Sequence, residues 1–242
     1  NVRGAPSHYA KDAQKIVVGY WDSINKDLKI AKSHDAGQTW ETSTVDSTGD
    51  VGSDSSVYYT GDTILIAYRS NTNGDLKFAK STDLGSTWDI KMIDTQGDVG
   101  SGVKMDVIGN SVFEVYRDSS AGHLKFAKST DLGSTWTTKI ITTDNGQWAS
   151  IDAADSDNIF ISYGLGNEIK LAKSINGGDT WATSLISSGQ QGSQPKRTSI
   201  YAASTQRLFV VFNTPVGGTG TSGSSSLLLS ISSDGGQTWS RD

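Results

Sequence analysis

The chain has 242 residues, a formal net charge of −5 and no cysteine. Its acidic balance offers no electrostatic footprint for nucleic acid or an anionic membrane surface. No apolar run approaches the roughly 20 residues of a membrane-spanning helix, and neither a disulfide framework nor a thiolate metal site is available. We therefore expect a monomer with no nucleic-acid or membrane partner, no metal and no cofactor. Its richness in small polar residues favours a secreted or surface-exposed protein.

Five similar segments recur along the chain, and each of them ends in tryptophan. They are SHDAGQTW from Ser33, STDLGSTW from Ser81, STDLGSTW from Ser129, SINGGDTW from Ser174 and SSDGGQTW from Ser232. The tryptophans are spaced by 48, 48, 45 and 58 residues. Such a period is typical of propeller and solenoid repeats. We expect a single domain over residues 1–242, with units at about 1–48, 49–96, 97–144, 145–188 and 189–242.

Each unit carries four apolar stretches that read as strands. In the second unit they lie near residues 56–59, 63–69, 76–80 and 88–93, and they are rich in Ile, Tyr and Phe. A four-stranded sheet of this size cannot cover both of its faces, so each unit must pack against its neighbours. The predicted fold is all-β: a five-bladed β-propeller of four-stranded antiparallel blades, closed by packing between the first and last blades.

The repeated segment itself is predicted to form the turn between the third and fourth strands. Its Asp accepts hydrogen bonds from turn amides, its Gly supplies a positive φ, and its Trp tucks under the turn. Asn176 replaces the Asp in the fourth copy and can still cap the turn. A position that recurs in every unit serves cohesion, so no catalytic role is expected for these acids.

The pattern Ser-x-Asp-x-Gly-x-Thr-Trp resembles the Asp box, or BNR repeat, of sialidases and other glycan-handling propellers. The resemblance covers the chain through its five boxes and implies the propeller fold. Sialidases of this family also carry an arginine triad, an Arg-Ile-Pro stretch, a Tyr/Glu nucleophile pair, an Asp acid and six blades. This sequence has no Arg-Ile-Pro stretch and five boxes. The resemblance therefore favours the architecture over sialidase activity.

Residues that depart from the repeat are the candidates for function, because they differ between blades. Loops between blades, and between second and third strands, usually form the functional face of a propeller. Candidates there and along the inner strands are Trp21, Arg69, Lys104, Asp106, Arg117, Trp148, Asp152 and Arg197. The two tryptophans could stack on a sugar, and the three arginines could clamp a carboxylate.

Three of these candidates lie on one face of the predicted inner strands. Lys104, Asp106 and Asp152 are expected to meet near the central channel, because side chains two residues apart share a face. They could form a solvated ion cluster, a polar ligand floor or a carboxylate pair. Glu114 stands out because the equivalent positions in the other units are apolar, and we expect it to pair with Lys104 or Arg69.

Three functions follow from this pattern. The favoured hypothesis is a non-catalytic propeller, not an enzyme, that binds a carbohydrate or similar polar ligand on the loop face. One alternative is a glycoside hydrolase, for which Asp106 and Asp152 are the only aligned carboxylate pair. The other alternative is a scaffold domain for protein interaction.

Overall fold

The computed structural model describes residues 7–10, 14–188, 197–216 and 224–241. These residues form twenty strands in five antiparallel four-stranded sheets, and each sheet is built from consecutive strands. None of the described residues lies in an α-helix, and no helix among them is long and apolar enough to cross a membrane. The predicted fold class, an all-β five-bladed propeller, is confirmed.

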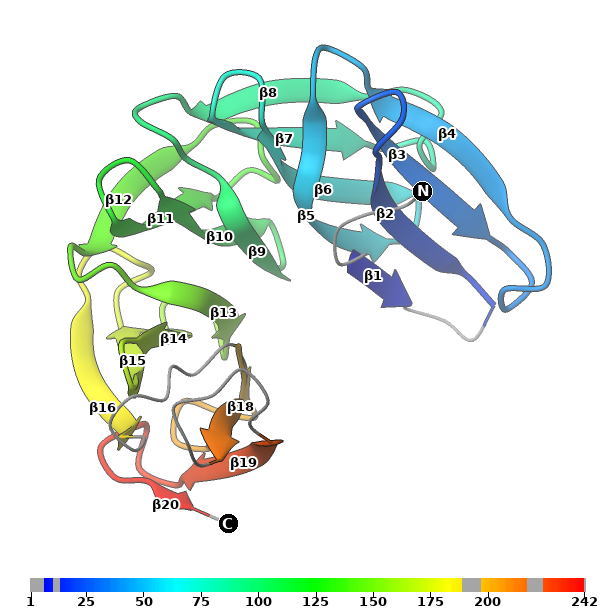
Figure 1. Cartoon of the computed structure of the whole chain (residues 1–242). Coiled ribbons are helices and arrows are strands. Elements are labelled where there is room, and N and C mark those ends of the chain that lie inside the picture. The colour runs from blue at the N-terminus through cyan, green and yellow to red at the C-terminus, as the bar shows by residue number, and fades with distance from the viewer. Residues whose placement is uncertain (1–6, 11–13, 189–196, 217–223, 242) are drawn as a thin grey trace.

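The blades follow one another along the chain, and the first strand of each lies innermost (Figure 1). Blade 1 contains β1 (Ser7–Ala10), β2 (Ile16–Asp22), β3 (Asp27–Ser33) and β4 (Glu41–Asp46). Blade 2 contains β5 (Val51–Thr60), β6 (Thr63–Ser70), β7 (Asp75–Ser81) and β8 (Asp89–Asp94). Blade 3 contains β9 (Ser101–Ile108), β10 (Ser111–Asp118), β11 (His123–Ser129) and β12 (Thr137–Thr142). Blade 4 contains β13 (Gln147–Ala153), β14 (Ile159–Leu165), β15 (Glu168–Ser174) and β16 (Ala182–Ser188). Blade 5 contains β17 (Thr198–Ala202), β18 (Leu208–Val216), β19 (Ser224–Ser232) and β20 (Ser240–Arg241).

The core lies between neighbouring blades, because the middle strands are apolar on both faces. In β6, Ile64 and Ile66 pack against blade 1, whereas Leu65 and Ala67 pack against blade 3, and all four are fully buried. Alternate side chains of a strand point to opposite faces, so an uninterrupted apolar run indicates a sheet covered on both sides.

The Asp boxes hold the turns between third and fourth strands, as predicted. In the second box the Asp83 carboxylate accepts hydrogen bonds from the Thr87 amide at 2.9 Å and the Thr87 hydroxyl at 2.6 Å. These bonds, led by the one from the hydroxyl, lower the pKa of Asp83 to about 2. In the third box Trp136 packs edge-on against Phe78 of the preceding blade, with ring centroids 4.9 Å apart. The box therefore ties each turn together and also joins it to its neighbour.

A buried polar contact repeats across the first two blade interfaces. Asp46, at the end of β4, accepts a hydrogen bond from the Tyr68 hydroxyl at 2.7 Å and an ion-paired one from Lys77, both in blade 2. Asp94 of blade 2 is bound in the same way by Tyr116 and Lys125 of blade 3. Thr142 occupies the corresponding register position in blade 3, since it lies opposite Leu124 as Asp94 lies opposite Leu76. The hydroxyl of Tyr163 in blade 4 is correspondingly buried without a hydrogen-bond partner.

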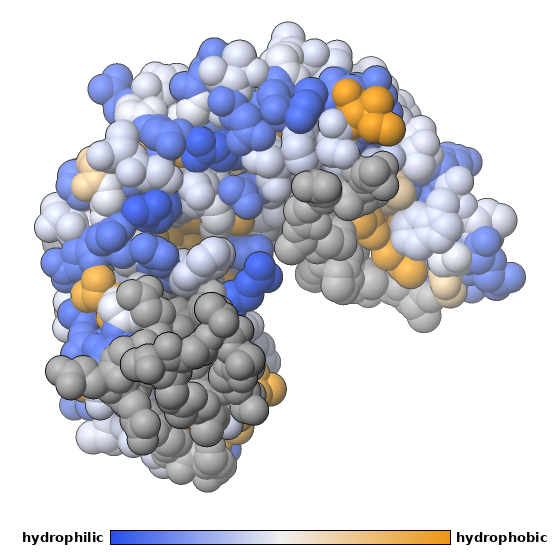
Figure 2. Space-filling view, viewed as in Figure 1, coloured by the Kyte–Doolittle hydropathy of each residue, from blue (hydrophilic) through white to orange (hydrophobic). Residues whose placement is uncertain are grey.

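The predicted closure of the ring is wrong. The five sheets lie side by side along an open arc, with blade 1 and blade 5 at its two ends (Figure 1). Figure 2 shows open space between those ends. The rotation from one described blade to the next, repeated over five blades, falls short of a full turn, so the first and last blades do not form the expected packing interface.

Candidate functional site

A cavity of about 480 Å³ opens near the axis of the arc, where the innermost strands of blades 2 to 5 converge. Its lining residues come from β5, β9, β10, β11, β13 and β17 and from the loops that lead into them. They are Asp54, Ser101, Gly102, Lys104, Tyr116, Arg117, Leu124, Gly146, Gln147, Trp148, Ala149, Arg197 and Thr198. Four of the eight residues predicted as candidates, namely Lys104, Arg117, Trp148 and Arg197, therefore share one site.

Four of the lining residues occupy the same position of the repeat. When the blades are aligned, Lys104 is equivalent to Ser56, Ser150 and Ser199 of the other inner strands. The position two residues earlier is occupied by Asp54, Gly102, Trp148 and Arg197. The strands leave their regular register there: the ladders between first and second strands shift between Val51 and Ser55 and between Gln147 and Ser150. Such irregularities re-aim side chains next to binding sites. One variable position, repeated around the axis, thus supplies four different groups to the cavity.

The cavity is positively charged. Lys104, Arg117 and Arg197 line it, against the single carboxylate of Asp54 among its described lining residues. Partial burial lowers the pKa of Lys104; the neighbouring Asp54 opposes this and Arg197 adds to it. One oxygen of Asp54 accepts a hydrogen bond from the Gly102 amide at 3.1 Å, which fixes the carboxylate across the interface of blades 2 and 3. The site is suited to an anionic group.

Trp148 forms one wall and is held in a strained conformation. Its φ is 56°, in the left-handed region that bulky residues rarely adopt, and the residue is 52% exposed. The guanidinium of Arg197 lies over the indole ring, 5.8 Å from its centroid. The Trp148 carbonyl accepts a hydrogen bond from the Thr198 hydroxyl at 3.0 Å. A strained backbone conformation persists only where surrounding contacts hold it, and such residues are found most often at functional sites.

Arg117 reaches the cavity from the end of β10. Its guanidinium donates to the side-chain oxygen of Asn145 at 2.5 Å and to the Ser119 hydroxyl at 3.3 Å. Both partners are neutral, so the positive charge of Arg117 is not cancelled by these contacts. Arg117 and Asn145 lie in blade 3 and in the loop that leads to blade 4.

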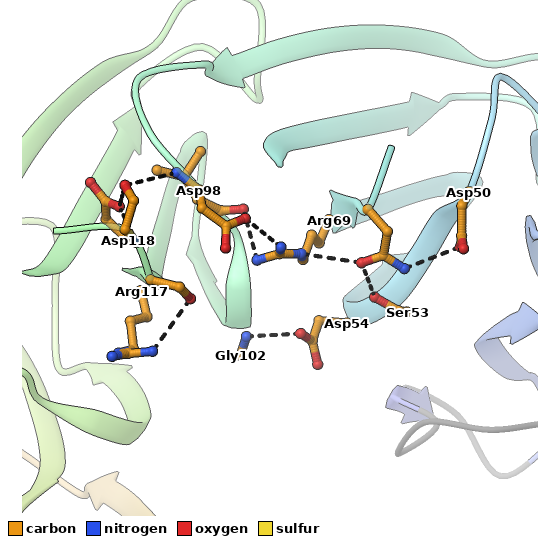
Figure 3. A network of polar contacts seen from close by, with 12 residues as sticks. Asp50, Ser53, Asp54, Arg69, Asp98, Gly102, Arg117 and Asp118 are labelled. Carbon is orange, nitrogen blue, oxygen red and sulfur yellow. Dashed lines mark hydrogen bonds and ion pairs between the residues drawn. The ribbon is translucent and has the colours of Figure 1, made fainter. Parts of the chain in front are cut away.

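Arg69 is not one of the residues that line the cavity. It forms an ion pair with Asp98, and its Nε donates to the side-chain oxygen of Asn71 at 3.2 Å (Figure 3). A further bond joins Arg69 to the Val99 carbonyl at 3.4 Å. These contacts connect β6 with the loop before β9 and give Arg69 a role in joining two blades.

Asp106 and Asp152 lie between blades and outside the cavity lining. Asp106 accepts hydrogen bonds from the Val107 and Ala153 amides, each at 2.8 Å, and Asp152 accepts one from the Ala202 amide at 2.6 Å. Burial raises the pKa of Asp106, and it raises that of Asp152 to about 6 despite the hydrogen bond from Ala202. Asp106 also contributes to the raised pKa of Asp152, so these two acids interact as expected, whereas the charges that act on Lys104 are those of Asp54 and Arg197.

Glu114 does not form the predicted pair with Lys104 or Arg69. Its side chain is fully buried and neither carboxyl oxygen has a hydrogen-bond partner. Burial raises its pKa well above the ordinary value. Glu114 occupies the repeat position of Ile66, which packs against the preceding blade, whereas Lys104 lines the cavity and Arg69 pairs with Asp98.

Trp21 lies at the end of β2 and is not among the cavity-lining residues. Its indole nitrogen is buried without a partner, and the Lys26 ammonium lies over the ring, 4.6 Å from its centroid. Sequence reasoning missed Asp54, although its repeat position is the one that holds Trp148 and Arg197. The residue at this repeat position differs from blade to blade, and this variation was the sequence signal that could have identified Asp54.

Comparisons with known proteins agree with this architecture. The sequence pattern of the BNR/Asp-box repeat family matches residues 230–241. No curated protein matches the chain in sequence. Among solved structures, NanB sialidase from Streptococcus pneumoniae aligns with a TM-score of 0.63 and 13% identity, over 96% of this chain and 59% of that one. A Trypanosoma rangeli sialidase aligns with a TM-score of 0.61 and 18% identity, over 97% of this chain and 46% of that one. The α-L-arabinanase of Penicillium chrysogenum aligns with a TM-score of 0.65 and 16% identity, over 99% of this chain and 80% of that one. The chain thus spans less than two thirds of either sialidase.

These matches correct the prediction that the chain is not an enzyme. The prediction depended on the missing sialidase motifs, but the similar structures include sialidases, an arabinanase and a family-43 glycoside hydrolase. Because glycoside hydrolases with different substrates share this fold, the absence of one family's motifs does not exclude catalysis. The five boxes, the four-stranded blades and the structural matches together show a β-propeller with Asp-box turns, whose architecture is like that of sialidases.

Proposed function

We propose that the cavity binds an anionic sugar unit of a glycan. The observation that carries this proposal is the convergence of Lys104, Arg117 and Arg197 on one cavity beside the exposed ring of Trp148. A carboxylate on the ligand would take charge-assisted hydrogen bonds from the guanidinium groups. The indole face suits the apolar face of a sugar ring, because aromatic side chains combine a large contact area with fixed geometry.

The charge balance of the cavity supports an acidic ligand over a neutral one. Its described lining residues carry three cations and one carboxylate. Hydrogen bonds to charged groups contribute about 1.5–3 kcal/mol each. Since about 1.4 kcal/mol corresponds to a tenfold change in affinity, removal of one cation should weaken binding about 10- to 100-fold.

Calorimetric titration with N-acetylneuraminic acid, glucuronic acid, galactose and glucose tests the proposal. We expect binding of at least one acidic sugar and a loss of about tenfold or more in Arg197→Met. Arg207→Met is the matched control, because Arg207 lies over the Phe209 ring and does not line the cavity. Equal binding of acidic and neutral sugars, or equal losses in the two variants, would contradict the proposal.

A second candidate function is hydrolysis of a glycosidic bond at the same cavity. Asp54 favours it, because this carboxylate is held at the cavity wall by the Gly102 amide and faces a site large enough for a sugar unit. A carboxyl group at such a position can act as general acid or base. The similarity of the fold to that of sialidases and an arabinanase also supports this candidate.

Fluorogenic glycosides of N-acetylneuraminic acid and of L-arabinofuranose test for hydrolysis. Asp54→Asn should lower kcat by about 100-fold or more, as expected for loss of a general acid–base group. Asp89→Asn is the control, because the Asp89 side chain is 65% exposed in the outermost strand of blade 2. Turnover that is indifferent to Asp54→Asn would exclude Asp54 as the acid–base group.

A further inference from the structure

The sequence contains three Asn-Gly pairs, and one of them borders the cavity. The pairs are Asn73-Gly74, Asn145-Gly146 and Asn176-Gly177. An asparagine before glycine can lose its side-chain amide spontaneously, because glycine has no Cβ that would shield the attacking backbone nitrogen. Gly146 lines the cavity, and Asn145 is exposed in the loop between β12 and β13. A new charge at Asn145 would therefore alter the electrostatic potential of the cavity.

The hydrogen bonds of the three glycine amides differ. The Gly74 amide donates to the Ser70 carbonyl and the Gly177 amide donates to the Asp157 carbonyl, each at 2.9 Å. The Gly146 amide has no acceptor among the residues that the structure describes. A hydrogen-bonded amide must first break its bond before its nitrogen can turn toward the preceding side chain. Gly146 is therefore the glycine best able to attack.

Arg117 prepares the side chain of Asn145 for this attack. Its guanidinium donates a hydrogen bond to Oδ1 of Asn145 at 2.5 Å. A cationic donor at this oxygen stabilises the negative charge that develops there when a nucleophile adds to Cγ. Asn176 is held differently, because its Oδ1 accepts from the Thr180 amide and its Nδ2 donates to the Thr180 hydroxyl, each at 2.9 Å. The Asn176 side chain thus caps its own box turn.

We propose that Asn145 is a site of deamidation whose reaction reduces the positive charge of the cavity. The Gly146 nitrogen attacks Cγ of Asn145, a C–N bond forms, the Cγ–Nδ2 bond breaks, and the amide proton leaves with Nδ2 as ammonia. Water then opens the cyclic imide to give aspartate or isoaspartate, so one water is consumed for each ammonia released. In the aspartate product a carboxylate oxygen takes the place of Oδ1 and pairs with Arg117, which cancels the charge of that guanidinium.

Peptide mass spectrometry of the folded chain, sampled over weeks at mildly alkaline pH, tests the modification. We expect Asn145 to deamidate about tenfold or more faster than Asn73 and Asn176. The urea-denatured chain is the matched control, because all three asparagines precede glycine and should then react at similar rates. Reaction of Asn73 or Asn176 as fast as that of Asn145 in the folded chain would overturn the proposal. An intact Asn145 under conditions in which the denatured chain reacts would do the same.

Two arginine variants test the role of the guanidinium. Arg117→Met should slow the deamidation of Asn145 severalfold, because the developing negative charge loses its cationic donor. Arg207→Met should leave the rate unchanged, because Arg207 lies over the Phe209 ring and does not line the cavity. Equal rates in the two variants would show that Arg117 does not activate the side chain.

The effect on the cavity rests on the proposed function and has its own measurement. Asn145→Asp carries the charge of the product from the start and should bind acidic sugars about tenfold more weakly than the wild type in calorimetry. Asn145→Gln keeps a neutral amide, so its loss of affinity should be smaller. Equal affinities of the two variants would refute the loss of cavity charge. Deamidation of Asn145 in a wild type that binds no acidic sugar would support the modification and contradict the proposed function.

Discussion

Replacement of Glu114 should stabilise the protein, which is unusual for a buried residue. The side chain is 0% exposed, and both carboxyl oxygens lack hydrogen-bond partners. An unsatisfied buried polar group costs about 1–3 kcal/mol. The residues at the same position of the other blades are Val18, Ile66, Ile161 and Val210, so the site accepts a branched apolar side chain. Where the carboxyl is protonated in both states, at about pH 4, we expect Glu114→Ile to raise the free energy of unfolding by about 1–3 kcal/mol.

The effect should depend on pH in a defined direction. Burial raises the pKa of Glu114 well above its ordinary value of 4.5, so the folded state binds the proton more tightly than the unfolded state. The stability linked to this proton is fully present below the unfolded pKa and is lost as the pH rises toward the folded pKa. Between the two pKa values the wild type should lose about 1.4 kcal/mol per pH unit relative to Glu114→Ile.

Urea denaturation at pH 4, 5, 6 and 7 measures both quantities. Glu114→Gln is the informative companion, because it abolishes the titration but keeps a polar group in the same place. We expect Glu114→Gln to lose the pH-dependent difference and to be less stable than Glu114→Ile. A stability difference between wild type and Glu114→Ile that is constant with pH, or a destabilised Glu114→Ile, would refute the reasoning.

Three further predictions concern blade contacts and the cavity. Lys77→Met should lower stability by about 3–5 kcal/mol in urea unfolding, because it leaves the buried carboxylate of Asp46 without its ion pair. Asp152, whose pKa burial raises to about 6, should make the wild type lose stability as the pH rises from about 4 to 6. Asp152→Asn keeps an acceptor for the Ala202 amide, so denaturation of this variant should lack that slope. Trp148→Asn relieves a φ of 56° and should leave the unfolding midpoint within a few degrees of wild type, while calorimetry should show binding of acidic sugars about tenfold weaker or worse.

The blades were predictable because their defining residues recur. The box turn needs a carboxylate or amide to cap its amides and a Gly with positive φ, and Asp83 with Gly85 at 79° shows both. Strand alternation likewise follows from residue spacing alone. Closure was not predictable in this way, because it depends on the small rotation between one blade and the next. That rotation follows from side-chain packing across each interface, which a count of repeats does not contain.

The cavity was predictable in part, for a related reason. A residue that differs from its equivalents in the other blades correctly indicated the cavity where it lies near the axis, as with Lys104, Trp148 and Arg197. The same criterion failed for Glu114, whose equivalents in the other blades are apolar but which is buried at a blade interface. Asp106 shows a third outcome, because it accepts the Ala153 amide of the next blade. Sequence variation between blades marks a change of local chemistry, and only the direction of the side chain decides whether a ligand can meet it.

Cohesion and recognition use different columns of the same repeat. The positions of Tyr68 and Lys77 face along the arc and bind the preceding blade in blades 2 and 3, whereas blade 5 has the apolar residues Phe212 and Leu228 at these positions. The repeat position of Asp54, Trp148 and Arg197 lines the cavity, and blades 2 to 5 each contribute one residue at that position. One of these residues, Asp54, also joins blades 2 and 3 through the Gly102 amide. One repeat position of this chain thus supplies four different residues, Asp54, Gly102, Trp148 and Arg197, to a single positively charged cavity.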